Sequence, residues 1–179
     1  MTKKEFLKKI TKDKKDILEE FIGVLKKKRI PFCIVGGLAV NAYVEPVVSL
    51  DLDAVIVVDR IKELLLQLGR KYKIKKYPNS INISSSLSDL RIQIQTDLRY
   101  QEFIQRAKQR DVLGYKLPVA SIEDVLQGKI WAVQDETRRP SKRQKDLADI
   151  LRLVEKKKAL TYLIPQSLKK RLSLHTRPA

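Results

Sequence analysis

The sequence predicts a mixed α/β fold, in which a sheet is flanked by helices and followed by a helical C-terminal part. Three observations predict it. A short apolar run, Phe32–Val35, ends at two glycines, and the Val/Ile-rich segment 49–58 begins with Asp51 and Asp53. Beyond residue 120 the apolar residues recur at helical spacing instead. Strands that alternate with helices and then give way to helices are typical of a mixed sheet with a helical extension.

The length and composition predict one compact domain. The chain has 179 residues, of which 43% are hydrophobic. It has no run of 18 apolar residues, and its first residues lack the apolar core of a signal peptide, so we expect no membrane span and a cytoplasmic location. The single cysteine, Cys33, lies in an apolar run and is expected to be a buried strand residue.

The net charge of +17 concerns partners, not fold. A cationic surface attracts polyanions, which favours nucleic acid or another phosphate-rich partner. The alternative is a lysine-rich surface that is merely solvated. Aromatic residues make up 6% of the chain and are not interleaved with the basic clusters, so the sequence indicates no stacking platform for single strands.

The first half of the chain contains most of the expected strands. Apolar residues recur at helical spacing near the N-terminus and stop before Pro31, because the residue ahead of a proline avoids helical angles. In the segment LRIQIQTD polar and apolar residues alternate as in a strand. The expected elements are a helix over 4–28, a strand over 32–35, a short helix over 38–44, a strand over 49–58, a helix over 61–68 and strands over 71–77, 80–85 and 89–96.

The second half is expected to be mainly helical. Ser121 is the expected N-cap of one helix, with Asp124 three residues later as an approximate capping box. The expected elements are a helix over 100–109, a short extended piece over 112–120 and helices over 121–136, 142–158 and 165–172. We therefore divide the chain into an N-terminal helix (1–30), a core (31–118), a helical part of the same domain (119–172) and a loose tail (173–179).

Two short motifs carry the candidate chemistry. Gly36 and Gly37 follow a strand and precede a helix, where a ligand phosphate can approach the backbone, although two glycines are more often only a turn. Asp51 and Asp53 project from the same side of the next strand. Two carboxylates this close call for a cation, and oxygen ligands suit Mg²⁺ or Mn²⁺. The alternative is that one or both are solvated at the strand end.

The stretch IVGGLAVNAYVEPVVSLDLDAVIVV resembles the DNA polymerase beta-like nucleotidyltransferase superfamily, and is most similar to its minimal bacterial and AbiEii-type toxin members. The resemblance covers most of residues 30–155. It implies a nucleotidyltransferase fold in which Gly36 and Gly37 hold the phosphates of a nucleoside triphosphate (NTP). It also implies that Asp51 and Asp53 bind divalent metal, and that a third carboxylate on a later strand completes the site.

The helical part adds to this resemblance. Lys129 and the segment Lys145-Asp146-x-x-Asp149 are similar to residues of AbiEii-type proteins that approach the active site, which implies that Lys129 and Lys145 bind the nucleotide. The residues alone leave an alternative open. Lys145 and Asp149 are spaced for an ion pair, and both aspartates lie opposite the leucines of the helix, as on a salt-bridged helix surface.

The chain departs from the family pattern at two places. Where the family usually has its third acid, inside the strand, this chain has Gln93 or Gln95, and glutamine has no titratable group. Asp97 has the same parity at the end of that strand and is our candidate for the third catalytic carboxylate. The family's arginine before the first aspartate is absent, and Ser49 is expected to replace its threonine near the phosphate.

These observations leave three hypotheses. The first is a metal-dependent enzyme that moves a nucleoside monophosphate (NMP) from an NTP to a hydroxyl, with RNA such as the tRNA 3′ end as acceptor. The resemblance implies that such an enzyme is the toxin of a toxin–antitoxin pair, with a cognate antitoxin protein as partner. The second is a catalytically impaired protein of this fold that acts as a basic nucleic-acid or protein binding module. The third is an enzyme with the same chemistry that modifies a protein side chain.

Overall fold

The computed structural model of the chain describes residues 5, 9 and 17–174. Most of the first half of the helix expected over 4–28 lies outside these residues. Its second half is helix α2 (Ile17–Lys27), which buries one apolar face and ends before Pro31, as the sequence predicts. None of the helices in the described part of the chain is long and apolar enough to cross a membrane.

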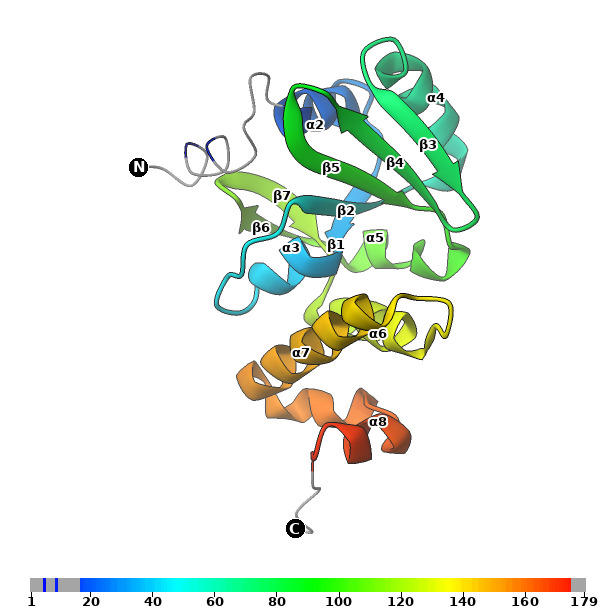
Figure 1. Ribbon diagram of the computed structural model, residues 1–179. Helices are drawn as coiled ribbons and strands as arrows, with labels where there is room; N and C mark the ends of the chain where they lie inside the picture. Colours follow the sequence, from blue (N-terminus) through cyan, green and yellow to red (C-terminus); the bar gives the residue numbers. More distant parts are fainter. Residues whose placement is uncertain (1–4, 6–8, 10–16, 175–179) are drawn as a thin grey trace.

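The centre of the molecule is a seven-stranded mixed sheet with the order β3-β4-β5-β2-β1-β7-β6 (Figure 1). Strand β2 lies in the middle, antiparallel to β1 and parallel to β5. The strands are β1 (Phe32–Val35), β2 (Asp51–Ile56), β3 (Lys73–Tyr77), β4 (Ser80–Ser85), β5 (Ser88–Gln95), β6 (Lys108–Val112) and β7 (Tyr115–Val119). The mixed α/β class predicted from the sequence is confirmed.

Helices cover the two faces of the sheet unequally. The helices α2 and α4 pack behind the β3–β5 half, while α6 and α7 pack against each other below the sheet, next to α3 (Figure 1). Among the helices of the described part of the chain, none lies in front of β3, β4 and β5 in this view. The remaining helices are α3 (Gly36–Asn41), α4 (Val58–Leu68), α5 (Phe103–Arg106), α6 (Ile122–Gln134), α7 (Pro140–Lys156) and α8 (Gln166–Arg171), with 3-10 turns η1 (Leu98–Tyr100) and η2 (Lys158–Leu163).

One apolar cluster joins the sheet to these helices. It includes Cys33, which is fully buried as expected, and the inward residues of β2 and β5. At the start of α6 the Ser121 hydroxyl accepts a hydrogen bond from the backbone N–H of Asp124 at 3.1 Å, which confirms the predicted N-cap. The core therefore holds the central strand and the first helix of the C-terminal part in a fixed relation.

The prediction of one helix over 100–109 is wrong. That segment contains the last residue of η1, the single turn of α5 and the first residues of β6, which pairs with β7 as an antiparallel hairpin. The hairpin turn is made by Leu113 and Gly114, whose φ angles are 56° and 84°, and positive φ at both central positions matches the twist of paired strands. The polar composition of β6 hides it in the sequence, since an edge strand needs little apolar surface.

Candidate active site

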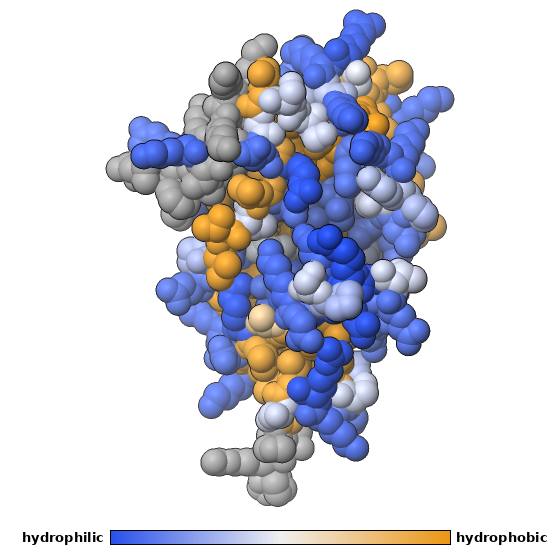
Figure 2. Space-filling model, viewed as in Figure 1, coloured by the Kyte–Doolittle hydropathy of each residue, from blue (hydrophilic) through white to orange (hydrophobic). Residues whose placement is uncertain are grey.

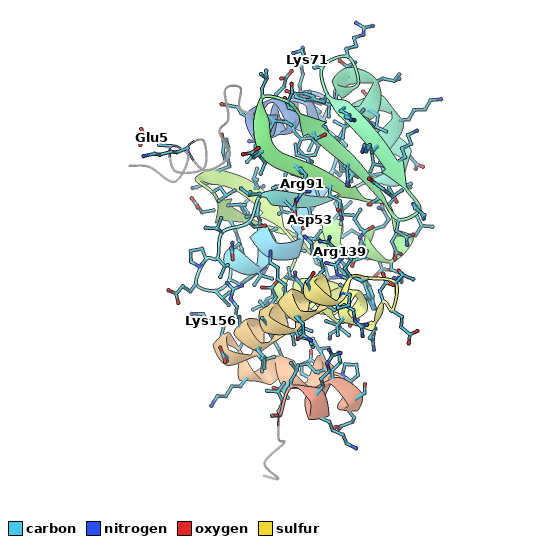
Figure 3. All side chains as sticks on the ribbon, viewed as in Figure 1. Glu5, Asp53, Lys71, Arg91, Arg139 and Lys156 are labelled. Atoms are coloured by element: carbon cyan, nitrogen blue, oxygen red, sulfur yellow. The ribbon has the colours of Figure 1, made fainter. Side chains whose placement is uncertain are left out.

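The candidate site begins at the open end of β2. Leu52 and Ala54 are fully buried on one side of this strand, so Asp51 and Asp53 project together from the other side. Figure 3 shows Asp53 in the middle of the molecule, where the sheet meets the α6–α7 pair. In the register of the sheet, Asp53 lies between Val35 of β1 and Gln93 of β5.

The glycine pair is part of this arrangement. Helix α3 starts at Gly36 itself, directly after β1, so the two glycines form its first turn. Gly36 has a φ of 67°, and a Cβ placed on it would lie 2.0 Å from Oδ2 of Asp53. Any side chain here would displace the carboxylate. Glycine is thus required at position 36 both for the backbone angle and for the contact with Asp53.

Gly37 faces a different pair of side chains. A Cβ on Gly37 would lie 3.5 Å from the Ser49 hydroxyl and 3.8 Å from Nζ of Lys145. The structure therefore brings together three of the residues predicted to bind nucleotide, although they come from α3, the loop before β2 and α7. The backbone of a glycine, a hydroxyl and an ammonium group that lie close together can bind a phosphate.

The two aspartates of β2 differ in their neighbours. Asp51 forms ion pairs with Nε of Arg91 at 2.9 Å and Nζ of Lys142 at 3.4 Å. Burial raises the pKa of Asp53 to about 6; the charges of Lys129, Arg138 and Lys142 oppose the rise, and that of Asp51 adds to it. Within the described residues no side chain forms an ion pair or hydrogen bond with the Asp53 carboxylate. A half-buried carboxylate without a paired cation favours a bound cation.

A pocket of about 80 Å³ opens beside Asp53. Gly36, Gln93, Gln95 and Lys129 line it together with Asp53. This volume has room for about two or three waters at about 30 Å³ each, which is enough for a metal ion with part of its water shell but not for a nucleotide. A nucleotide would therefore extend from the pocket into open space.

A wider groove of about 490 Å³ continues from this pocket. The two share wall residues, including Gln95, Tyr100 and Arg138. The ring of Trp131 lies in the groove wall, and the guanidinium of Arg99 sits 4.7 Å from the ring centroid. The groove extends the pocket on the side of α6.

Lys129 is buried within an ion cluster between α6 and α7. Its Nζ lies 2.9 Å from Oδ1 of Asp146 and 2.7 Å from Oδ2 of Asp149. Burial lowers the pKa of Lys129, but the two carboxylates outweigh this effect and hold the pKa above its usual value. Arg138 and Arg152 complete the cluster, with Nε of Arg138 2.6 Å from Asp146 and Nη1 of Arg152 2.7 Å from Asp149.

The interpretation of Asp146 and Asp149 as an exposed, salt-bridged helix surface is therefore wrong. Both are less than 4% exposed, because they face α6 and neutralise Lys129. Asp149 pairs with Lys129 and Arg152, whereas Lys145 is exposed and lies over Gly37. Asp146 and Lys129 nevertheless also line the pocket beside Asp53.

Asp97 lies outside this pocket. Its carboxylate accepts hydrogen bonds from Nε and Nη2 of Arg99 at 2.9 and 2.6 Å and caps η1, in the wall of the wider groove. The guanidinium of Arg99 holds the pKa of Asp97 below its usual range. Gln93, in contrast, is the register partner of Asp53 on the neighbouring strand. Asp97 as the third carboxylate stays a prediction, and it requires release from Arg99.

The residues present suit one kind of divalent metal site. Among the described residues no group of three or more histidines, cysteines or acidic residues is placed to hold a metal. Mg²⁺ is commonly held by one or two carboxylates and completed by substrate phosphates and water. Asp51 and Asp53 beside a small pocket and a phosphate cradle match that requirement.

Three cations near the site were not predicted. Arg91 alternates in phase with Gln93 along β5, so its position on the side of Asp51 was available from the strand pattern. Lys142 and Arg138 come from the start of α7 and the loop before it. No local pattern connects them to β2, because only the packing of α6 and α7 below the sheet brings them there.

A comparison with protein families shows the family to which this chain belongs. The family described as nucleotidyl transferase AbiEii toxin, Type IV TA system, matches residues 17–177. The chain belongs to this family. A search of curated protein sequences gives no match.

Solved structures support the fold of this AbiEii-family protein. ANT(2")-Ia in complex with adenylyl-2"-tobramycin aligns with a TM-score of 0.58 and 14% identity over 88% of this chain and 94% of that chain. A nucleotidyltransferase-like protein from Paracoccidioides brasiliensis aligns with 0.55 and 18% over 94% and 89%. The lincosamide adenylyltransferase LnuA aligns with 0.54 and 12% over 79% and 98%.

These findings confirm three expectations from the sequence. The resemblance to AbiEii-type proteins is confirmed as family membership, and the nucleotidyltransferase fold is confirmed. The expected enzyme class, an NMP transferase that uses an NTP, is confirmed at the level of the family.

Proposed function

We propose that this AbiEii-family protein transfers an NMP from an NTP to a hydroxyl of an RNA acceptor, such as the tRNA 3′ end, with Mg²⁺ or Mn²⁺ held by Asp51 and Asp53. The observation that carries the proposal is the Asp53 carboxylate, which is pressed against Gly36 with its pKa raised by burial and without an ion-pair partner in the described structure. A second carboxylate next to it makes a divalent cation the fitting occupant.

The residues around Asp53 then have distinct roles. The backbone at Gly37, the Ser49 hydroxyl and the Lys145 ammonium group hold the triphosphate, because all three meet at one point. Lys129 lines the pocket, where it would contact the triphosphate, while Asp146 and Asp149 keep it in place. A bound divalent metal would lower the pKa of the attacking hydroxyl and offset charge on the leaving pyrophosphate.

The reaction is a single displacement at phosphorus. The acceptor hydroxyl oxygen forms a bond to the α-phosphorus, the bond to the bridging oxygen of pyrophosphate breaks, and the hydroxyl proton is released. Asp97 remains our proposal for a third carboxylate that assists this proton release. A movement that frees it from Arg99 is required, since the two form a paired contact in the groove wall.

The RNA acceptor is favoured by the net charge of +17, which attracts a polyanion. The family's description as a toxin of a Type IV TA system supports a cognate antitoxin as partner and a cytoplasmic place of action. The second candidate function is a nucleotide-binding or RNA-binding module without catalysis. The neutral Gln93 beside Asp53, where a third acid would lie, favours it.

Transfer of labelled NMP separates these candidates. The protein is incubated with each α-labelled NTP, Mg²⁺ and total RNA, beside an Asp51→Ala/Asp53→Ala control. We expect label on RNA that the double variant abolishes. Label that the double variant retains would contradict the assignment of Asp51 and Asp53. RNA binding without transfer, unaffected by the double substitution, would favour the binding module, and label on a protein would point to the third hypothesis from the sequence.

A further inference from the structure

The face of the sheet that holds Asp53 continues beyond the active site. In register, Asp53 of β2 lies beside Gln93 of β5, Gln93 beside Asn82 of β4, and Asn82 beside Lys75 of β3. Residues paired in this way point to the same side of a sheet. The row therefore runs from the active site to the outer strand, across three strand spacings or about 14 Å.

The two sides of this half of the sheet have opposite character. On the far side the strands present isoleucines and leucines, which α2 and α4 cover. On the near side the residues of β3, β4 and β5 are mainly serine, amide and basic side chains, and no helix of the described residues covers these strands in Figure 1. Hydrophilic side chains also dominate the molecular surface from the same viewpoint in Figure 2.

The charges on this open face are unevenly placed. Lys73 and Lys75 are exposed on β3, and the side chain of Arg91 on β5 is 60% exposed while it holds Asp51. Tyr77, at the end of β3, is 51% exposed. The only carboxylate that these three strands add to the face is Asp89 at the start of β5. The face thus offers two lysines at its outer edge, neutral hydrogen-bonding groups in the middle, Arg91 beside Asp51 and one exposed aromatic ring.

We propose that this open face of β3–β4–β5 is the path along which the RNA acceptor strand reaches Asp53. The inference rests on the proposed function, since the hydroxyl at the end of the strand must arrive at Asp53. Lys73 and Lys75 contact the phosphates upstream of that end. Gln93, which is half-buried, offers a donor and an acceptor to sugar and base edges, and Tyr77 stacks on a base.

The chemistry favours RNA over an acidic protein as the occupant. Amides and hydroxyls between the cations match a partner in which bases and sugars alternate with phosphates. The face is also continuous with the reaction centre, whereas an acidic protein has no need to reach Asp53. A purely solvated face would give no reason for cations at one edge of a polar row that ends at the catalytic carboxylate.

Two charge-reversal variants of equal net charge test the path. Lys73→Glu/Lys75→Glu changes the open face, and the matched control Lys62→Glu/Lys76→Glu changes exposed lysines on α4 and on the other side of β3. Binding of a labelled single-stranded RNA 12-mer is measured by fluorescence anisotropy over a range of salt concentrations, with circular dichroism melts to verify folding. We expect the first pair to weaken binding at least tenfold and to reduce the salt slope by about 1.4, since each lost phosphate contact on a single strand removes about 0.7. The control should stay within threefold.

Tyr77→Ala provides an independent arm without a charge change. We expect at least fivefold weaker RNA binding with an unaltered salt slope, as for a lost stacking contact. Equal weakening by both lysine pairs would overturn the path in favour of diffuse attraction. If polyglutamate binds through Lys73 and Lys75 and the RNA does not, the partner is an acidic protein and the proposal is overturned.

Steady-state transfer distinguishes this inference from the proposed function. We expect Lys73→Glu/Lys75→Glu to raise the KM for RNA at least tenfold, with the KM for NTP unchanged. An unchanged KM for RNA in an active enzyme would refute the path and leave the proposed function intact. Face-dependent RNA binding by a wild-type protein that transfers no NMP would refute the function and leave the path intact.

Discussion

Two pairs of aspartates, one on β2 and one on α7, differ in how their charges are neutralised. Asp146 and Asp149 are almost fully buried, yet each oxygen pair is met by cations, with Lys129 between them. Asp53 is half-buried, but within the described structure only its neighbour Asp51 has ion-pair partners. The α7 pair is neutralised within the chain, whereas in the β2 pair Asp53 is left without a cation of its own among the described residues.

This difference indicates that one pair stabilises the fold and that the other serves the reaction. A buried carboxylate with its own cation is complete, and its removal costs stability. A buried carboxylate without one raises the free energy of the native state, which persists only where the surrounding structure holds it in place, as at functional sites. The predictions below test whether the α7 pair is structural and the β2 pair is a binding site.

The largest effect is expected for Lys129→Met. Removal of the ammonium group leaves Asp146 and Asp149 buried without their shared cation, which should lower the free energy of unfolding by about 3–5 kcal/mol. Urea denaturation measures this loss. The matched variant Lys145→Met changes an exposed lysine on α7 and should shift the free energy of unfolding by less than about 0.5 kcal/mol. Its effect should instead be a higher KM for NTP. Similar destabilisation by both variants would contradict the division between the two lysines.

Asp53→Asn should instead raise the free energy of unfolding at pH 7.5. The folded pKa of Asp53, about 6, lies above its usual 3.8, so the native state binds the proton more tightly than the unfolded chain. Wild-type stability therefore falls as the pH rises through this window, by up to about 3 kcal/mol at about 1.4 kcal/mol per pH unit. Asparagine carries no such penalty. The variant should be more stable than wild type at pH 7.5 and no more stable near pH 3.5, while NMP transfer is lost.

Magnesium titration gives the complementary measurement. Mg²⁺ should raise the melting temperature of the wild type at pH 7.5, because it binds the folded carboxylates, and should have little effect on Asp53→Asn. Asp59→Asn, a change at an exposed acid on α4, is the control and should respond as wild type does. An Asp53→Asn protein that loses stability at pH 7.5 would show that the carboxylate is already neutralised without metal.

The two glycines should also respond differently to alanine. Gly36→Ala puts a Cβ at a φ of 67° and against Asp53, so we expect a loss of about 2 kcal/mol in stability together with most of the activity. Gly37→Ala has only ordinary contacts at 3.5 Å and lies in the first turn of α3, where alanine favours the helix by up to about 1 kcal/mol. Thermal melts and NTP binding measure both. Equal loss in the two variants would argue against a specific contact between Gly36 and Asp53.

Local patterns in the sequence were enough to predict most of the sheet. The apolar runs and the alternation in 89–96 predict β1, β2 and β5 to within a few residues, because a strand with a buried side must have that pattern. They did not predict β6, whose polar residues pair at a sheet edge and resemble a polar helix. Edge strands depend on a partner strand, and local periodicity does not contain that information.

The residues of the site also fall into those that local sequence patterns predict and those that they do not. Asp51, Asp53 and the glycines lie within 18 residues and were predicted as one unit. The burial of Asp146 and Asp149 was missed, because it depends on α6 lying against α7. The register of β5 against β2 was also not available from the sequence, and it places Gln93, not Asp97, beside Asp53. Side chains brought together by long-range packing could only be located in the folded chain.

Gln93→Glu tests the position of residue 93 beside Asp53, and its expected effect is the smallest. A carboxylate at this position would face Asp53 across adjacent strands and supply a third acid, so divalent metal should bind about tenfold more tightly. Isothermal titration with Mn²⁺ measures the gain. Without metal the added negative charge should raise the pKa of Asp53 further and lower stability at pH 7.5.

Asp97→Asn tests the other candidate for the third carboxylate. If Asp97 is the third carboxylate, its removal weakens metal binding and abolishes transfer, and Gln93→Glu then restores part of both. If Asp97 serves only to hold Arg99, its removal leaves the metal affinity unchanged.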